Sequence, residues 1–297
     1  MGILFDEKTT TFTLNTKNTT YQMKADKDGF LLHLYYGSSA KGCMDYLLTY
    51  YDRGFSGNPY VHRNDRAYSM DALPQEFPLQ GNGDYRSPAL VVRNEDGTYA
   101  CDLRYKSHKI KKGKYSLKGL PAVYAEEDEA ETLEILMEDD LSKLQVTLLY
   151  GVLPECDIIT RSVKVENQGG GCIYLEKLQS ACLELLGGNY DVISFYGRHA
   201  MERNMQRTPV SHNNQVIGSR RGTSSHQYSP MMILAEQYTS EDAGSCYGMN
   251  FVYSGGFKGE VEKDQFNQIR MLLGLTDEMF CYPVKPGEEF YAPEVIL

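Results

Sequence analysis

Apolar and polar residues alternate along many short segments of the chain, and turn-forming residues separate these segments. In 132–138, apolar residues at alternate positions share one face, and Glu134 and Glu138 lie on the other. Segment 159–166 alternates in the same way. A period of two places successive side chains on opposite faces of a strand, as in half-buried antiparallel sheets. Further strands are predicted at 9–14, 19–23, 30–36, 99–105, 173–184, 191–196, 231–235, 247–253, 268–275 and 289–293.

The connections between these segments are short and rich in turn formers. Asn-Glu-Asp-Gly at 94–97 and Asn-Gln-Gly-Gly-Gly at 167–171 are predicted hairpin turns. A helical period is rare, and 41–50 is expected to form a short helix at most. We find no internal repeat and no low-complexity linker. The pattern therefore predicts one large all-β sandwich, with antiparallel sheets in a single domain spanning residues 1–297.

Two long segments interrupt the succession of strands. Residues 52–88 and 196–227 are polar and contain arginines, aromatic residues and many turn formers. Long loops inside a compact domain are usually functional or disordered. The arginines and aromatics favour an ordered surface that packs on a partner or ligand.

Composition removes several classes of partner. The 297 residues carry a net charge of -10 at pH 7, which disfavours binding to nucleic acid or to an anionic membrane surface. No signal peptide is visible, and no apolar run reaches the roughly 18 residues of a membrane helix. None of the seven cysteines has the spacing of a zinc site. We therefore expect a protein of the reducing cytoplasm, without a metal.

An abundance of tyrosine is the least ordinary feature of the composition. The chain has 23 Tyr and no Trp. Tyrosine suits both a β-rich core and contacts with sugars, because its ring is apolar and its hydroxyl is polar. The absence of Trp argues against a free-standing carbohydrate-binding module.

The motifs of several enzyme classes are absent. The sequence has no Gly-x-Ser-x-Gly elbow, no His-Glu-x-x-His and no phosphate-binding loop of the Walker type. Ser225 and His226 are adjacent, and neighbouring side chains on a strand point to opposite faces, so they make a poor nucleophile and base. We do not expect a serine hydrolase.

The remaining histidines are interpreted mainly as structural. His33 lies in an apolar run and is expected in the core, and His108 is expected in a surface turn after the predicted strand at 99–105. His199 and Glu202 would share a face only if their segment were helical. Loop packing is the preferred interpretation for that pair.

Carboxylates gather in segment 52–88, at Asp52, Asp65, Asp71, Glu76 and Asp84. Hydrolysis of a glycoside needs two carboxyl groups about 5–10 Å apart. Arginines neighbour these residues in sequence, which predicts ionised carboxylates rather than an acid of raised pKa. Two interpretations stay open: ion pairs that brace the loop, and contacts with a ligand.

Ordered motifs across almost the whole chain resemble the amino-terminal domain of family thirty-six α-galactosidases. They include DRGFSGNP at 52–59, NDRAYS at 64–69, GDYRSPA at 83–89, YGRHAMERN at 196–204 and GSRRGTSSHQ at 218–227. The resemblance implies a β-supersandwich of the galactose-mutarotase type. It also implies a following (β/α)₈ barrel that holds both catalytic aspartates, one in a Lys-Trp-Asp motif that this sequence lacks. On this basis residues 1–297 contain no catalytic residue, and no cofactor is expected.

The same resemblance implies a role for the loop at 52–66. Family members are commonly homotetramers in which this domain lines a neighbouring subunit's sugar pocket. The matching substrate-binding positions are Asp52 and Arg66, with Phe55 and Tyr60 around them. The implied enzyme is a retaining α-galactosidase acting on α-galactosides of the melibiose or raffinose type, through two carboxylates outside this chain. Specificity between α-galactosides and α-N-acetylgalactosaminides stays open.

Two other functions are retained as alternatives. One is a free-standing mutarotase-like epimerase that uses His199 with Glu202, or His226, as acid and base. The other is a galactose-binding sandwich or scaffold without catalytic activity.

Overall fold

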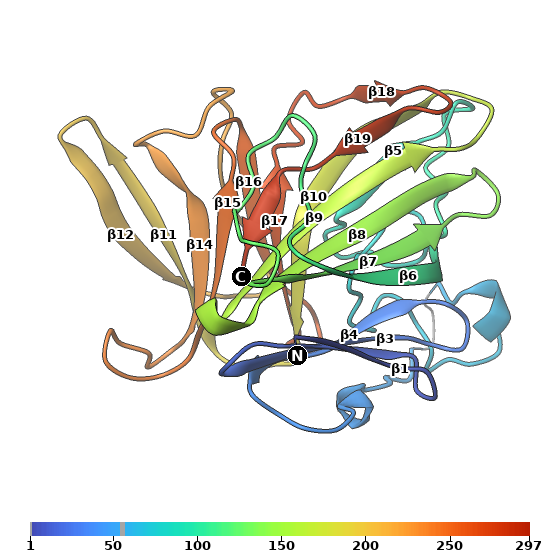
Figure 1. Ribbon diagram of the computed structural model, residues 1–297, viewed down its shortest axis with the longest axis horizontal. Coiled ribbons are helices and arrows are strands. Elements are labelled where there is room, and N and C mark those ends of the chain that lie inside the picture. The colour runs from blue at the N-terminus through green and yellow to red at the C-terminus, as the bar shows by residue number, and fades with distance from the viewer. Residues whose placement is uncertain (1, 54–56) are drawn as a thin grey trace.

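The computed structural model describes residues 2–53 and 57–297, and almost all of its regular structure is β. Figure 1 shows two large sheets that lie together, with a smaller sheet along one side. Among the described residues the helices are single 3₁₀ turns: η1 (Asp45–Leu47), η2 (Tyr60–His62) and η3 (Pro154–Cys156). The all-β prediction is confirmed, and η1 is the short helix expected within 41–50.

The largest sheet has ten strands within the described residues, and its pairings are antiparallel. The chain's last strand, β20, lies between β15 and β9 and joins the two halves of the sheet. Strand β19 pairs with β9 beside it. The spatial order is β12 (Met201–Pro209), β11 (Tyr190–Arg198), β14 (Tyr228–Glu236), β15 (Cys246–Val252), β20 (Glu294–Ile296), β9 (Ile158–Asn167), β8 (Leu144–Leu153), β7 (Glu131–Glu138) and β6 (Arg104–Lys112), with β19 at Glu289–Tyr291.

Two smaller sheets complete the described fold. The four-stranded sheet is a meander of consecutive strands. In the six-stranded sheet, the long strand β10 pairs with β17 at one end and with β5 and β18 at the other. The strands of the meander are β1 (Ile3–Asp6), β2 (Thr11–Asn15), β3 (Thr19–Ala25) and β4 (Leu31–Ser38); those of the other sheet are β13 (Asn214–Ser219), β16 (Phe257–Lys263), β17 (Ile269–Leu275), β10 (Ile173–Leu185), β18 (Tyr282–Val284) and β5 (Leu90–Arg93).

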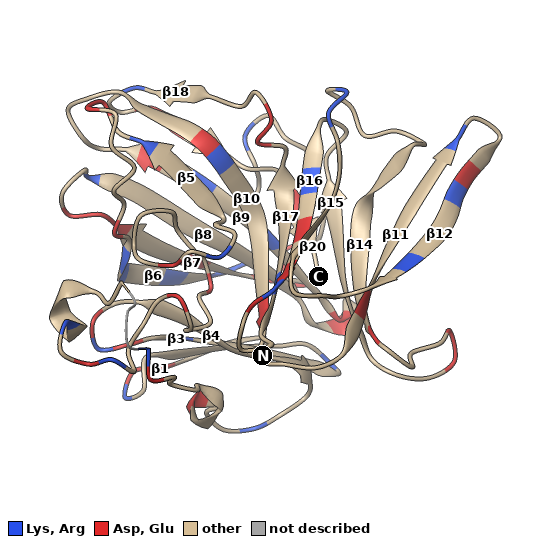
Figure 2. Ribbon diagram, turned by 180° about the vertical axis from the view of Figure 1, so that it is seen from behind, with Lys and Arg blue, Asp and Glu red and all other residues tan. Residues whose placement is uncertain are grey.

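One continuous apolar core joins the three sheets. In β7, Leu133, Ile135 and Met137 are buried, whereas Glu134 and Glu138 on the other face are partly exposed. This is the predicted alternation, and burial of apolar area is its main stabilising contribution. On the side seen in Figure 2, acidic and basic residues are interspersed along strands and loops.

The two predicted hairpin turns do form turns, but they do not join paired strands. The amide of Gly97 donates to the carbonyl of Asn94 at 2.9 Å, and Gly97 has a φ of 84°. At 167–171, the Asn167 side chain donates to the carbonyls of Gly171 and Val284, both at 2.8 Å. Each turn carries the chain from one sheet to another, because β5 and β10 pair in the six-stranded sheet and β6 and β9 in the ten-stranded sheet. The hairpin interpretation is therefore wrong.

Two other expectations need correction. Residues 99–103 form no strand, and β6 begins only at Arg104. Residues 196–227 are not one irregular loop, because they contain β12 and β13. Strand β12 is an edge strand with no fully buried residue, so its sequence lacks the alternation of a half-buried strand.

Candidate functional site

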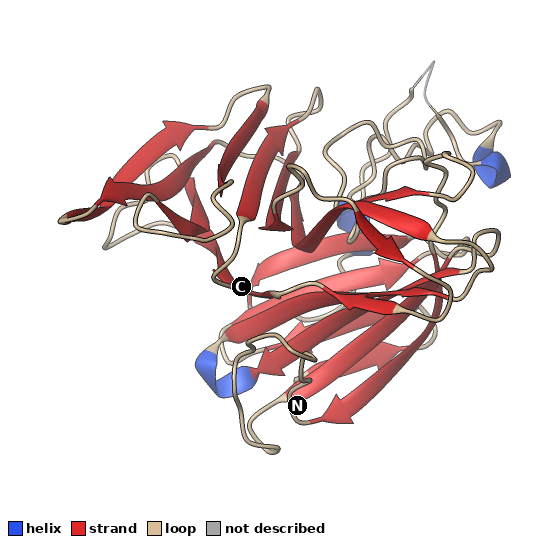
Figure 3. Cartoon of the chain, turned by 90° about the horizontal axis from the view of Figure 1, so that it is seen from above, coloured by secondary structure: helices blue, strands red, loops and turns tan. Residues whose placement is uncertain are grey.

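The segment from Asp52 to Pro88 has little backbone pairing of its own. Its described part holds η2, several turns and isolated bridges such as Leu32 to Gln75. Figure 3 shows a group of loops at the right-hand end of the molecule, beyond the strands, and this segment belongs to that end. Side-chain contacts must therefore hold it in place.

The predicted sugar contacts lie on the outer surface of this segment. The Nε atom of Arg66 donates to Oδ1 of Asp52 at 2.8 Å, with side chains 65% and 72% exposed. Close by in the chain, the Arg53 amide donates to the Arg66 carbonyl at 2.9 Å. The structure thus brings Asp52 and Arg66 together in open solvent.

Of the two aromatic residues predicted around this pair, the structure describes only Tyr60. Tyr60 lies in η2 and is 79% exposed. Its hydroxyl accepts a hydrogen bond from Arg63 at 3.0 Å, and the Arg63 guanidinium lies over its ring. Phe55 lies outside the described residues. The role of all four residues in sugar binding stays a prediction.

Glu76 belongs to this segment, and its side chain is completely buried. Its Oε1 accepts hydrogen bonds from Tyr21 and Tyr150, both at 2.7 Å, and lies 2.9 Å from Nη2 of Arg161. Its Oε2 lies 3.0 Å from Nδ1 of His33, which confirms the core position expected for that histidine. Burial alone would raise the pKa of Glu76, but Arg161 and His33 outweigh it and hold the pKa below its ordinary value.

A second buried cluster surrounds Asp84. Arg86 donates to Oδ1 at 2.9 Å and Arg270 to Oδ2 at 2.7 Å, and Arg270 also binds Glu184 at 2.6 Å. Arg86 further donates to the carbonyl of Leu73 at 2.7 Å, which ties the cluster to the loop backbone. Burial acts to raise the pKa of Asp84, but the two guanidinium groups dominate and lower it.

For three of the five loop carboxylates, these contacts favour the interpretation as ion pairs that brace the loop. Asp71 is ion-paired with Arg53. With Glu76 and Asp84 it braces the loop from within, and the lowered pKa values of Glu76 and Asp84 confirm the prediction of ionised groups there. Asp65 is exposed and accepts a hydrogen bond from the Ala67 amide at 2.9 Å. Of the five carboxylates, Asp52 and Asp65 remain open to solvent.

The other histidine candidates do not converge on a site. His108 is part of β6, and its ring lies 4.1 Å from that of Phe5, so the surface-turn interpretation is wrong. His199 lies in the turn between β11 and β12, and Glu202 lies at the start of β12, so the segment is not helical. Both side chains are exposed, and Glu202 accepts a hydrogen bond from the Ala200 amide at 2.9 Å. His226 is also exposed, in the loop before β14.

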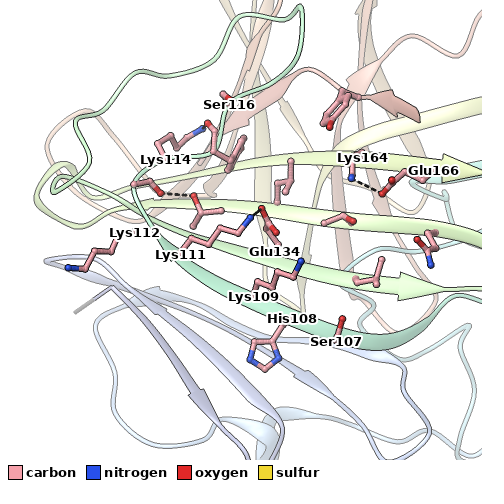
Figure 4. A pocket seen from close by; sticks show the side chains of 18 residues that line it. Ser107, His108, Lys109, Lys111, Lys112, Lys114, Ser116, Glu134, Lys164 and Glu166 are labelled. Atoms are coloured by element: carbon pink, nitrogen blue, oxygen red, sulfur yellow. Dashed lines mark hydrogen bonds and ion pairs between the residues drawn. The ribbon is translucent and has the colours of Figure 1, made fainter. Parts of the chain in front are cut away.

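A separate hollow of about 510 Å³ lies on the solvent face of β6 to β9. Figure 4 shows lysines along its floor, with His108 directed away from them. Lys111 pairs with Glu134 and Lys164 with Glu166, each at 2.6 Å. Lysines on β6 are typical of an edge strand protected against pairing with another chain.

The roof of this hollow is fixed by a buried ion pair. Lys114 pairs with Glu294, and the Val123 amide donates to the same carboxylate at 2.6 Å. Lys114 crosses directly above Gly151, where an added Cβ would come within 2.4 Å of its side chain. Glycine at 151 therefore lets the segment after β6 lie close to the sheet.

Residues 2–53 and 57–297 contain no group of three or more His, Cys, Asp or Glu side chains placed to hold a metal ion. No helix in this part of the chain is long and apolar enough to span a membrane.

Comparison with known proteins decides the family. Residues 29–285 match the profile of the glycosyl hydrolase family 36 N-terminal domain. The chain belongs to this family. Its family 36 domain is 59% identical, over the whole chain, to the bifunctional α-galactosidase/sucrose kinase AgaSK of Mediterraneibacter gnavus. It is 42% identical, over 99% of the chain, to α-galactosidase Mel36A of Lactobacillus acidophilus.

Solved structures carry the same fold. The galactosidase domain of AgaSK superimposes with a TM-score of 0.97 at 58% identity, over 99% of this chain and 41% of that one. The α-galactosidase AgaA of Geobacillus stearothermophilus, in complex with stachyose, has a TM-score of 0.93 at 41% identity, over 96% of this chain and 40% of that one. The supersandwich prediction is confirmed. The family 36 domain spans 32% of AgaSK and 40% of Mel36A, so it corresponds to a part of these enzymes.

Proposed function

We propose that this domain is the non-catalytic sandwich of a longer α-galactosidase that hydrolyses terminal α-galactosides of the melibiose, raffinose and stachyose type. The observation that carries the proposal is the match along the whole chain to α-galactosidases, of which the chain spans about a third to two fifths. Structures of AgaA with stachyose and with raffinose support the substrate class. The reaction retains configuration through two carboxylates outside residues 1–297, without a metal or cofactor.

The contribution of this chain is to assemble subunits and to complete the sugar pocket of a neighbouring subunit. Asp52 and Arg66 bind vicinal hydroxyls of the sugar through charge-assisted hydrogen bonds, and Phe55 and Tyr60 shield them. An exposed ion pair contributes only about 0–1 kcal/mol to stability, so stability alone does not account for the Asp52–Arg66 pair. The loop that carries the pair is nonetheless braced by several buried charges, which are costly to desolvate. This arrangement supports a role of the pair in binding. The assembly is a cytoplasmic homotetramer.

The first experiment separates the domain from the complete protein. Residues 1–297 and the full-length polypeptide that carries them are each assayed with raffinose and a chromogenic α-galactoside. We expect hydrolysis only by the full-length protein, and a tetramer in analytical ultracentrifugation. Hydrolysis by residues 1–297 alone would place the catalytic groups inside this domain and overturn the proposal.

A mutarotation assay on residues 1–297 serves as the control for the epimerase alternative. We expect galactose to mutarotate at the rate of the buffer, because His199, in the β11–β12 turn, and Glu202, at the start of β12, are both exposed. An accelerated rate that is lost in the His199→Ala variant would favour the epimerase instead.

A further inference from the structure

Phe266 lies at the turn between β16 and β17, far in sequence from the 52–88 loop. The turn is held by Asp264, whose Oδ1 accepts hydrogen bonds from the amides of Phe266 and Gln268 at 2.8 and 2.9 Å. Gln268 in turn accepts a hydrogen bond from Arg86 at 3.3 Å. The turn is therefore held by its own hydrogen bonds, and Arg86 ties it to the buried cluster around Asp84.

The Phe266 ring contacts the two residues that flank Asp52. The ring of Tyr51 stacks on it, with centroids 4.0 Å apart and planes inclined by 16°. The Arg53 guanidinium lies over the same ring, 5.1 Å from its centroid. With the side chains of 51 and 53 both held on Phe266, Asp52 is left on the outer surface, where it meets Arg66.

Arg53 links this support to the other half of the exposed pair. Its side chain pairs with Asp71, which is only 8% exposed, and its backbone amide donates to the carbonyl of Arg66. The backbone on both sides of the Asp52–Arg66 contact is thus fixed through a single residue. Exposed side chains such as Asp52 and Arg66 lose rotamer freedom when they bind a ligand, which weakens binding. A backbone that is already fixed reduces this entropic cost.

We propose that Phe266, acting through Tyr51 and Arg53, is a positioning residue that pre-organises Asp52 and Arg66 for sugar contact. This inference rests on the proposed function of that pair. Phe266 itself touches no substrate. Its effect is to hold a carboxylate and a guanidinium in the orientation in which both reach adjacent hydroxyls.

The test uses the full-length protein with raffinose as substrate. Phe266→Ala removes the stacking surface, and we expect KM to rise about three- to tenfold, the effect of one or two side chains that must be ordered on binding. The value of kcat should change less than twofold, because no catalytic group moves. Phe266→Tyr keeps the ring and should restore the wild-type KM. Phe266→Leu keeps apolar volume without a stacking face, and replaces the alanine variant if that variant does not fold.

A variant cycle shows whether Phe266 acts through Asp52 and Arg66. In a background that carries both Asp52→Ala and Arg66→Ala, Phe266→Ala should raise KM no further. The proposal would be overturned if the increases in KM from the separate substitutions were additive. It would also be overturned if Phe266→Leu lowered KM below the wild-type value. Equal KM values for Phe266→Tyr and Phe266→Ala would also overturn it.

Failure of the proposed function gives a different result. If Asp52→Ala and Arg66→Ala both leave KM unchanged, the pair does not contact sugar. Positioning is then measured by amide hydrogen exchange at residues 51–53 and 66–71. Faster exchange in Phe266→Ala but not in Phe266→Tyr would support positioning without sugar contact, and unchanged exchange in both would overturn it.

Discussion

The β7–β8–β9 part of the large sheet and the 52–88 loop are both firmly held, but by different interactions. In the sheet, continuous antiparallel pairing satisfies the backbone, and apolar side chains such as Leu133 and Val146 fill the core. In the loop the backbone is scarcely paired, and buried charges around Glu76 and Asp84 take over. The stability of the sheet therefore depends on the burial of apolar area. The stability of the loop depends on ion pairs, and hence on pH.

Loss of a buried charge partner should have the largest effect. Arg161→Met leaves Glu76 buried without its guanidinium, and we expect the free energy of unfolding to fall by about 3–5 kcal/mol. Urea denaturation measures this change. The matched control is Arg220→Met, which removes an exposed partner of Glu278 and should change stability by about 0–1 kcal/mol.

The double variant Arg161→Met/Glu76→Gln sharpens that prediction. It removes both charges, so part of the lost stability should return. If the double variant is no more stable than Arg161→Met, the destabilisation does not arise from the uncompensated carboxylate.

A cavity in the sheet should destabilise the domain without this dependence on charge. Leu133→Ala removes a fully buried side chain, and we expect a loss of about 2–5 kcal/mol. The loss should be the same in urea titrations at pH 7 and pH 4. A loss that changed strongly with pH would mean that the sheet and the loop clusters are not energetically separate.

Acid should weaken the charge clusters. The pKa values of Glu76 and Asp84 are lowered in the fold, so their contribution is present above their ordinary values of 4.5 and 3.8. It is lost as the pH falls through the lower folded-state values. The free energy of unfolding should therefore fall with acid below about pH 4.5. The fall should be smaller in Arg161→Met/Glu76→Gln, and parallel pH profiles for the two proteins would contradict this account.

The smallest effect on stability is expected for the exposed pair. Arg66→Ala should change the free energy of unfolding by no more than about 1 kcal/mol. In the full-length protein it should nevertheless lower kcat/KM for galactosides by one to several kcal/mol of transition-state binding, as for a lost charged hydrogen bond. The control is Arg220→Ala, which removes an exposed arginine that pairs with Glu278 outside this loop and should leave the kinetics unchanged. Unchanged kinetics, with the assembly proposed above intact, would leave the loop with a structural role only.

The sequence predicts many of the strands, but it misses some with an alternating burial pattern, such as β5 and the first half of β8. Alternation in 132–138 and 159–166 identifies β7 and β9. In β7 one face meets the core and the other is partly exposed, whereas residues 159–163 of β9 are buried on both faces. Alternation overlooks β12, whose edge position leaves both faces in contact with solvent. The turn formers at 94–97 and 167–171 locate the turns but contain no information on which strands pair, because pairing depends on residues far away in the chain.

Prediction of the site is limited for the same reason. Carboxylates beside arginines in 52–88 indicate ion pairs, and Asp52 does meet Arg66. Asp84 also meets its sequence neighbour Arg86, as the pattern indicates. The other guanidinium partners of Glu76 and Asp84 are Arg161 and Arg270, on β9 and β17, and no local motif connects them to the loop. Phe266 is missed likewise, since a lone phenylalanine in a turn has no distinguishing signal in sequence.

The position of β20 determines when the large sheet can close. Strands β6 to β9 form one block, and strands β11, β12, β14 and β15 form the other. The three residues Glu294–Ile296 pair with Val252 to Asn250 on one side and with Arg161 and Thr160 on the other. During synthesis the ribosome must therefore release residue 296 before the blocks can be joined. Until then each block presents an open strand edge to the cell, and a chaperone or a second nascent chain can compete for it.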